Sequence, residues 1–180
     1  MMSGFYERVA LSDGVLVPVR EVRPEDAPAL RRLVGRLSAD SVYRRYFGRM
    51  KELSERQARH FAEVDGHGRY ALVALDPENE DEIVGVARYE RESAGGDEAE
   101  YAIVVEDRMQ GRGLGHALTR ALVEGARLRG VRRLYAMVMP ENKDMLKLLG
   151  SLGLPEDIRW EDGVEYVTVH LYPEDAKKAS

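Results

Sequence analysis

The 180-residue sequence contains no cysteine, which excludes disulfide bonds, a thiol nucleophile and cysteine-ligated metal sites. It also has no apolar run close to the roughly 20 residues that a membrane-spanning helix requires. The first 14 residues, MMSGFYERVALSDG, are too polar for a signal peptide. We therefore expect a cytoplasmic protein with no membrane partner.

Positive charge is not in excess either. The net charge is -5, so nothing indicates nucleic-acid binding. The four histidines show no metal-ligand spacing, and we expect no metal site; they are His60, His67, His116 and His170. What remains is the profile of an ordinary globular domain, with 44% hydrophobic and 33% charged residues.

The pattern of apolar residues predicts strands and helices that alternate irregularly. Strands are expected at residues 15–22, 69–76, 82–92, 99–105, 131–139, 157–160 and 164–172. Helices are expected at residues 24–37, 38–47, 54–64, 114–129 and 142–152. This order predicts an α/β (α+β) fold with a central mixed, mostly antiparallel sheet of about seven strands flanked by helices. We expect one domain over residues 1–180, with an ordered core at about 14–173 and a tail at 174–180.

A glycine-rich turn, QGRGLG at residues 110–115, joins the strand at 99–105 to the long helix. Each glycine inside a helix costs about 1 kcal/mol relative to alanine, so a reason for three of them is needed. Free N–H groups at a helix start bind phosphate. A dinucleotide fingerprint fails because His116 stands at its last glycine, and a P-loop fails because its lysine is missing. The alternative is that the glycines only allow a sharp turn and close packing of the helix on the strand. Arg112 could contact a phosphate or be solvated.

The turn resembles a known signature. Gln110, Gly113 and Gly115 match the Q/R-x-x-G-x-G/A motif of the GNAT acetyltransferase superfamily, and the segments VREVRPEDAPAL and ENKDMLKLLGSLG extend the resemblance over nearly the whole chain. The resemblance implies a GNAT-type domain that uses acetyl-coenzyme A as acyl donor, without a metal. It implies that the pyrophosphate is held by Gln110, Gly111, Arg112, Gly113, Leu114, Gly115 and His116, and that backbone groups of Ile103, Val104 and Val105 align the pantetheine arm.

Glu100 is the candidate general base. A free lysine has a pKa of about 10.4, so transfer to an amine requires a group that accepts a proton. Glu100 shares one face of its strand with Ala102 and Val104, and a carboxylate at the edge of an apolar strand is partly desolvated. The stretches AEYAIVV and SVYRRYF resemble the bacterial protein-lysine acetyltransferase branch, in which this glutamate is the base, directly or through a water. The alternative is that Glu98 and Glu100 mark the solvent-exposed end of a strand.

Two further positions bear on the chemistry. Asn142 could bond the pantetheine arm, cap the following helix, or do both. Leu149 stands where many members of the superfamily have a tyrosine that protonates the leaving thiolate. The protein-acetylating branch often lacks this tyrosine, and a thiolate with a pKa near that of cysteine leaves without help.

The resulting hypothesis is an N-acetyltransferase that moves acetyl directly from coenzyme A to an amine, with a protein lysine as the leading acceptor. The segment Tyr43–Arg59, with six basic and two acidic residues, could dock an acidic protein surface or be a solvated helix face. The alternatives are a small-molecule amine acetyltransferase with an enclosed acidic acceptor pocket, and a non-catalytic acyl-coenzyme A sensor. A homodimer is a further possibility.

Overall fold

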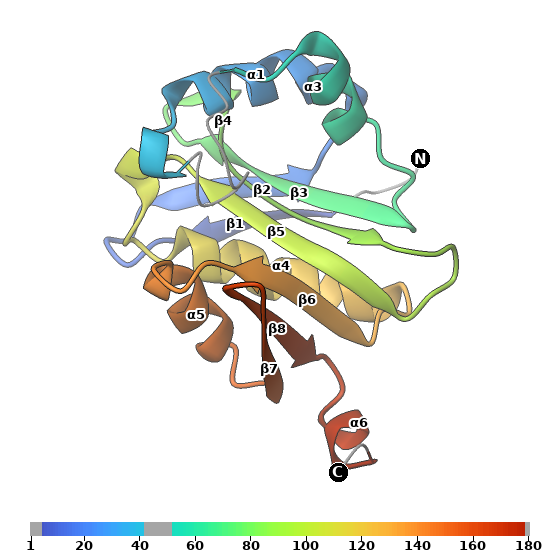
Figure 1. The fold of residues 1–180 in the computed structure, drawn as a ribbon. Coiled ribbons are helices and arrows are strands. Elements are labelled where there is room, and N and C mark those ends of the chain that lie inside the picture. Colours follow the sequence, from blue (N-terminus) through green and yellow to red (C-terminus); the bar gives the residue numbers. More distant parts are fainter. Residues whose placement is uncertain (1–4, 42–51, 179–180) are drawn as a thin grey trace.

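The structure is a computed structural model, and it describes residues 5–41 and 52–178. Within these residues, eight strands form one sheet in the order β1-β2-β3-β4-β5-β6-β8-β7 (Figure 1). The strands are β1 Tyr6–Ala10, β2 Leu16–Glu21, β3 Arg69–Asp76, β4 Asn79–Arg91, β5 Glu98–Val105, β6 Arg133–Val138, β7 Glu156–Glu161 and β8 Val164–His170. The β5–β6 pair is parallel and the other pairs are antiparallel, which confirms the mixed, mostly antiparallel sheet.

Helices lie on both faces of this sheet (Figure 1). They are α1 Ala27–Arg36, α3 Glu55–Ala62, α4 Leu114–Leu128, α5 Lys143–Gly150 and α6 Pro173–Lys178, with short 3-10 turns at Pro24–Asp26 and Asp107–Met109. Helices α1 and α3 cover one face near β4, and α4 covers the other face of β3, β4 and β5. The sheet therefore separates two apolar cores, one under each helical layer.

The apolar stripes of the helices face the sheet. In α1, Leu30, Leu33 and Val34 are buried, while Leu37, just after the helix, is only partly buried. In α4, Ala121 is partly buried and four other apolar residues are buried: Leu114, Leu118, Leu122 and Ala126. Ser54 caps α3, since its hydroxyl accepts a hydrogen bond from the Gln57 N–H at 3.1 Å.

Both ends of the chain extend beyond the predicted core. One strand beyond the seven expected is present: β1, which pairs with β2 from Tyr6↔Arg20 to Ala10↔Leu16. Its side chains are mostly exposed at the sheet edge, so the sequence carries no apolar alternation there. The predicted tail forms α6, which Arg132 holds through an ion pair to Asp175 at 2.7 Å. Of the helix predicted at 38–47, residues 39–41 are helical, Ser38 precedes them without helical structure, and residues 42–47 lie outside the described residues.

Gly125 allows α4 to approach the sheet closely, and its replacement is the first prediction. A methyl group at this position would lie 2.6 Å from Cε1 of Tyr70, whose buried ring also carries the Arg129 guanidinium at 3.8 Å. The ring cannot move aside, so we expect Gly125→Ala to destabilise the fold by about 1–3 kcal/mol. Gly35→Ala is the matched control, because no atom lies within 4 Å of its added methyl in α1. Thermal denaturation of both variants tests this; equal melting temperatures would contradict it.

Candidate active site

The central strand β5 and its parallel neighbour β6 separate part of the way along. They pair at three positions, from Glu98↔Arg133 to Glu100↔Tyr135, although β5 continues to Val105 and β6 to Val138. The other edge of β5 stays paired with β4 as far as Gly85↔Val105. Beyond Glu100, the backbone N–H and C=O groups of β5 that face β6 are therefore left without strand partners, and an amide-containing ligand can pair with them.

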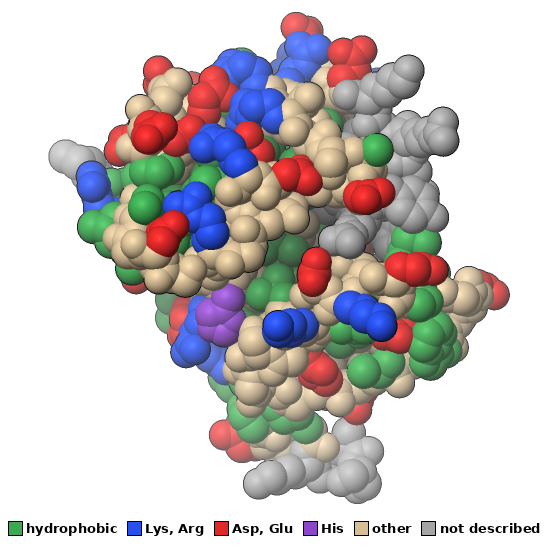
Figure 2. All heavy atoms as spheres, turned by 90° about the vertical axis from the view of Figure 1, so that its left-hand side faces the viewer, with side chains coloured by type: hydrophobic (Ala, Val, Ile, Leu, Met, Phe, Trp, Pro, Cys, Tyr) green, Lys and Arg blue, Asp and Glu red, His purple; other side chains and the backbone are tan. Residues whose placement is uncertain are grey.

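A cavity of about 610 Å³ occupies this gap, a size typical of small-molecule sites. Figure 2 shows this side of the molecule, where hydrophobic side chains lie at the bottom of a hollow bordered by charged ones. The cavity brings together ten of the twelve predicted site residues: Glu100, Ile103, Val104, Val105, Gln110, Gly111, Gly113, Gly115, His116 and Asn142. The two others, Arg112 and Leu114, do not line it.

The sequence analysis missed one wall of the cavity. Helix α5 and the turn after it supply Asp144, Met145, Lys147, Leu148 and Ser151, and the helical spacing of these residues was the signal that could have found them. The remaining lining residues are Ser41, Tyr101, Ala102, Ala136 and Met137. Met137 and Ala136 lie on β6 where it has left β5, which only the sheet pairing reveals.

The glycine turn presents backbone amides at the end of this cavity. Gly111 and Gly113 have φ values of 72° and 90°, a conformation that costs other residues about 1–2 kcal/mol. The first helical hydrogen bond joins Ala117 N–H to Gly113 O at 3.1 Å, so the N–H groups of residues 114–116 lack intrahelical acceptors. This is the arrangement of an anion site at a helix start.

Gly115 is not required by packing within the protein. A methyl group at this position would lie 3.7 Å from the side chains of Ile103 and Leu148, which is an ordinary contact distance. All three residues line the cavity. The glycine therefore leaves room for a ligand, and the alternative of close helix–strand packing does not account for it.

Arg112 is directed away from the cavity toward the β1–β2 loop. Its Nε donates to Asp13 Oδ2 at 2.9 Å, and its backbone carbonyl accepts from the Ser12 N–H at 2.9 Å. Hydrogen bonds from the Val15 N–H and from Arg112 hold the pKa of Asp13 below its usual value. The ion pair is therefore intact at neutral pH and is lost only as the pH falls through that lowered pKa. The loop braces the glycine turn from outside.

Gln110 closes the same turn from inside. Its Nε2 donates to Val105 O at 2.9 Å and to Ser41 Oγ at 3.2 Å. Asp107 begins the 3-10 turn that precedes the glycine turn, and it accepts from the Ser38 N–H at 3.0 Å and from the Ser41 hydroxyl at 3.3 Å. These bonds connect the turn to the chain segment that follows α1.

His116 and Asn142 are fixed by neighbours on α5. Ser151 donates its hydroxyl proton to Leu148 O at 2.6 Å, so the His116 Nδ1–H donates to the Ser151 oxygen at 2.8 Å. Asn142 is buried and its Oδ1 accepts from the Met145 N–H at 3.2 Å, which confirms the helix cap. A contact of Asn142 with pantetheine stays a prediction.

Glu100 lies where the two strands separate, but its side chain is exposed. The expected partial desolvation is therefore not observed. On the same face, the Tyr135 hydroxyl donates to Glu92. Burial, this hydrogen bond and the negative charges of Glu100, Glu92 and Glu98 raise the pKa of Tyr135. Glu98, on the same strand face, forms an ion pair with Arg133 at 3.1 Å, whereas the Glu100 carboxylate is open to an approaching cation.

Leu149 cannot supply a proton, and within residues 5–41 and 52–178 the cavity wall contains one tyrosine, Tyr101. The Leu149 side chain is buried in the core between α5 and the sheet. Tyr101 lines the cavity, but its hydroxyl is fully buried and donates to Thr119 Oγ1 at 2.6 Å, while Thr119 donates to Gly115 O. Burial raises the pKa of Tyr101, which makes it a poor acid.

Residues 5–41 and 52–178 contain no helix that is long and apolar enough to cross a membrane. The same part of the chain holds no group of three or more His, Asp or Glu side chains placed to bind a metal ion.

A splayed parallel strand pair with a glycine turn at its end defines an acyl-coenzyme A-dependent transferase. Residues 17–155 match the family model for the acetyltransferase (GNAT) domain. The chain belongs to the GNAT acetyltransferase family and is an N-acetyltransferase whose acyl donor is acetyl-coenzyme A.

Individual relatives agree with this assignment. "Acetyltransferase PA5475" of Pseudomonas aeruginosa is 34% identical over 145 residues, 80% of this chain and 77% of that protein. "Acetyltransferase Pat" of Mycolicibacterium smegmatis is 31% identical over 161 residues, and the match spans 87% of this chain but 46% of that protein. The crystal structure of the GNAT domain of S. lividans PAT has a TM-score of 0.84 at 34% identity, covering 92% of this chain and 96% of that one.

The second prediction concerns Gly115→Ala. The added methyl fits among the protein atoms but occupies space in the cavity. We expect the dissociation constant for coenzyme A to rise about tenfold or more, because a single carbon group decides fit in a tight pocket. The melting temperature should stay the same or rise, since alanine is the better helix former. Calorimetric titration and thermal denaturation measure the two quantities; unchanged affinity would show that the ligand does not approach Gly115.

The third prediction concerns the loop that braces the turn. Asp13→Asn keeps the size of the side chain and removes its charge, so Arg112 loses its ion pair. We expect KM for acetyl-coenzyme A to rise about two- to fivefold with kcat nearly unchanged, as for an exposed ion pair that positions a binding loop. Glu7→Gln, which removes a charge from neighbouring β1, is the control. A lower KM would show instead that Asp13 withholds Arg112 from the phosphate.

Proposed function

We propose that this acetyltransferase modifies lysine side chains of proteins. The observation that carries the proposal is the position of Glu100, exposed at the open mouth of the cavity where β5 and β6 separate. A base in this place can be reached by a long side chain that projects from another protein.

The acceptor side argues against a small-amine enzyme. Such an enzyme needs an enclosed acidic pocket that surrounds its substrate. Among the described residues, the pocket next to Glu100 on its own face of β5 is apolar and holds about 20 Å³, too little for an amine substrate. The Glu100 carboxylate instead lies exposed at the mouth of the large cavity, where it attracts the ammonium group of a lysine.

The donor is held along β5 in this proposal. The backbone edge at Ile103–Val105, where the Val105 carbonyl already accepts from Gln110, pairs with the amides of pantetheine, and Asn142 contacts the same arm. The N–H groups of residues 111–116 bind the pyrophosphate, with the helix dipole of α4 adding to the attraction. For Arg112 and Leu114, only the backbone takes part, since their side chains point elsewhere.

The transfer is direct. Glu100 accepts a proton from the lysine ammonium, directly or through a water, and the neutral nitrogen attacks the thioester carbon. The C–N bond forms, the nitrogen gives up its second proton to solvent, and the C–S bond breaks so that the sulfur leaves as thiolate. The thiol has a pKa of about 8.5, so the thiolate is a good leaving group near neutral pH and takes up a proton from solvent.

The test compares acceptors and a Glu100 variant. Thiol release is measured with acetyl-coenzyme A and either a mixture of lysine-rich proteins or a panel of small amines, namely amino acids and polyamines. We expect release with the proteins, and a loss of about 100-fold or more in kcat for Glu100→Gln, as for removal of a general base. Coenzyme A affinity should not change.

Glu98→Gln is the matched control, since it lies two residues earlier on the same strand face. Equal loss in both variants would remove Glu100 from the mechanism. Release with small amines alone would establish the small-molecule enzyme. Tight coenzyme A binding without release from any acceptor would favour the sensor.

A further inference from the structure

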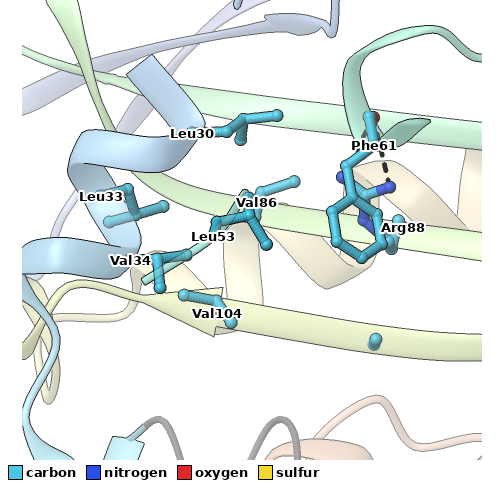
Figure 3. A pocket seen from close by; sticks show the side chains of 9 residues that line it. Leu30, Leu33, Val34, Leu53, Phe61, Val86, Arg88 and Val104 are labelled. Atoms are coloured by element: carbon cyan, nitrogen blue, oxygen red, sulfur yellow. Dashed lines mark hydrogen bonds between the residues drawn. The ribbon is translucent and has the colours of Figure 1, made fainter. Parts of the chain in front are cut away.

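Two buried hydroxyl groups lie in the core between β5 and α4. Tyr101 of β5 and Thr119 of α4 are 3% and 1% exposed, and the Tyr101 hydroxyl donates to Thr119 Oγ1 at 2.6 Å. On the opposite face of β5 the core is apolar, since Val104 packs there with Leu33 and Val34 of α1 (Figure 3). Burying a hydroxyl costs free energy, and phenylalanine and valine would fill the same space without that cost. The pair therefore has a role that filling space does not explain.

The hydrogen bonds of this pair run toward the glycine turn. Thr119 donates its own hydroxyl proton to Gly115 O at 2.7 Å, so the order of donation is Tyr101 hydroxyl, Thr119 hydroxyl, Gly115 carbonyl. Gly115 lies in the first turn of α4, and its carbonyl belongs to the same peptide unit as the His116 N–H. That N–H is one of those without an intrahelical acceptor, and both residues line the large cavity. The chain of hydrogen bonds therefore ends at a donor group of the ligand site.

A hydrogen bond accepted by the carbonyl of a peptide unit strengthens the donor at the other end of that unit. The C=O and N–H groups are conjugated within one plane, so electron density drawn toward the oxygen leaves the N–H more positive. Hydrogen bonds in a chain strengthen one another by about 10–30% each when they are shielded from water. The two hydroxyls also fix the plane of the Gly115–His116 peptide unit. An anion in front of the His116 N–H therefore meets a stronger and better oriented donor than the helix alone would supply.

We propose that Tyr101 and Thr119 are positioning residues for the acyl donor, and that they act through the Gly115 carbonyl to orient and polarise the His116 N–H toward the pyrophosphate of coenzyme A. Neither hydroxyl touches the ligand in this arrangement. The inference rests on the placement of the donor in the proposed function, with its pyrophosphate at the glycine turn and its pantetheine arm along β5. It follows that the two hydroxyls favour coenzyme A and not pantetheine, which has no pyrophosphate.

The experiment compares these two ligands in the double variant Tyr101→Phe with Thr119→Val. The double change removes both hydroxyls and keeps their shapes, so neither side chain leaves a buried polar partner behind. Calorimetric titration of the full chain measures the affinities. We expect the Kd of coenzyme A to rise at least about threefold and the Kd of pantetheine to stay within about 1.5-fold. An unchanged Kd for coenzyme A, or an equal loss for both ligands, would overturn the proposal, because the pair would then only hold α4 on the sheet.

Two control variants assign the effect to the hydroxyl chain. Thr119→Ser keeps the hydroxyl, so its Kd for coenzyme A should stay within about twofold of the unmodified chain. Tyr89→Phe removes an equally buried hydroxyl from the cross-strand neighbour of Tyr101; that hydroxyl donates to His67 O at 2.9 Å and not toward the glycine turn. Its coenzyme A affinity should not change. A loss in Tyr89→Phe as large as in the double variant would overturn the proposal, since any missing core hydroxyl would then have the same effect.

Kinetics and a second variant separate this inference from the placement of the donor. In the double variant, KM for acetyl-coenzyme A should rise by the same factor as the Kd, with kcat within about twofold, because the lost interaction lies far from the reacting carbon. If Gly115→Ala weakens coenzyme A binding while the double variant does not, the hydroxyl chain has no part in binding and the donor placement stands. If Gly115→Ala leaves coenzyme A binding unchanged, the placement itself fails, and the present proposal fails with it.

Discussion

The active site depends on one parallel strand pair that stops pairing early. A parallel connection requires a crossover, and here the crossover is α4, which begins just beyond the end of β5. This one crossover therefore creates two features of the site at the same place. Because β6 turns away after Tyr135, β5 offers a free backbone edge, and because α4 starts there, its unpaired N–H groups face the end of the gap. The cavity between β5 and β6 therefore results from the β5–α4–β6 crossover and not from any single side chain.

The surroundings of the glycine turn explain how a flexible sequence is held still. Its outer side is braced by Ser12 and Asp13. Just before the turn, the buried carboxylate of Glu106 accepts hydrogen bonds from Arg36 of α1 at 3.2 Å and from Arg108 at 3.0 Å. A buried charge without such partners would be strongly destabilising. The turn is therefore fixed to α1 on one side and to the first hairpin on the other, and glycine supplies backbone shape rather than mobility.

Much of this architecture could be predicted from the sequence, and the failures have physical causes. Strands buried on at least one face carry an apolar pattern, so seven were found, while edge strand β1, with its exposed Glu7 and Arg8, carries none. Glycine spacing predicted the position of the turn and of the unpaired N–H groups at the start of α4, because these depend on local backbone geometry. The direction of Arg112 and the exposure of Glu100 depend on which distant segments come near, namely Asp13 and the uncovered end of the sheet. Local sequence does not contain that information.

The buried position of Leu149 has a consequence for the proposed chemistry. Neither this residue nor Tyr101 can give a proton to the leaving sulfur, so in the proposed step the sulfur leaves as its thiolate. A thiol of pKa about 8.5 leaves readily as its anion near neutral pH, whereas an amine of pKa about 10.4 is almost wholly protonated there. The difficult proton transfer is therefore the one at the nucleophile. In the proposed chemistry the base is therefore needed more than the acid, which is why Glu100, at the point of strand separation, matters more than the tyrosine that Leu149 replaces.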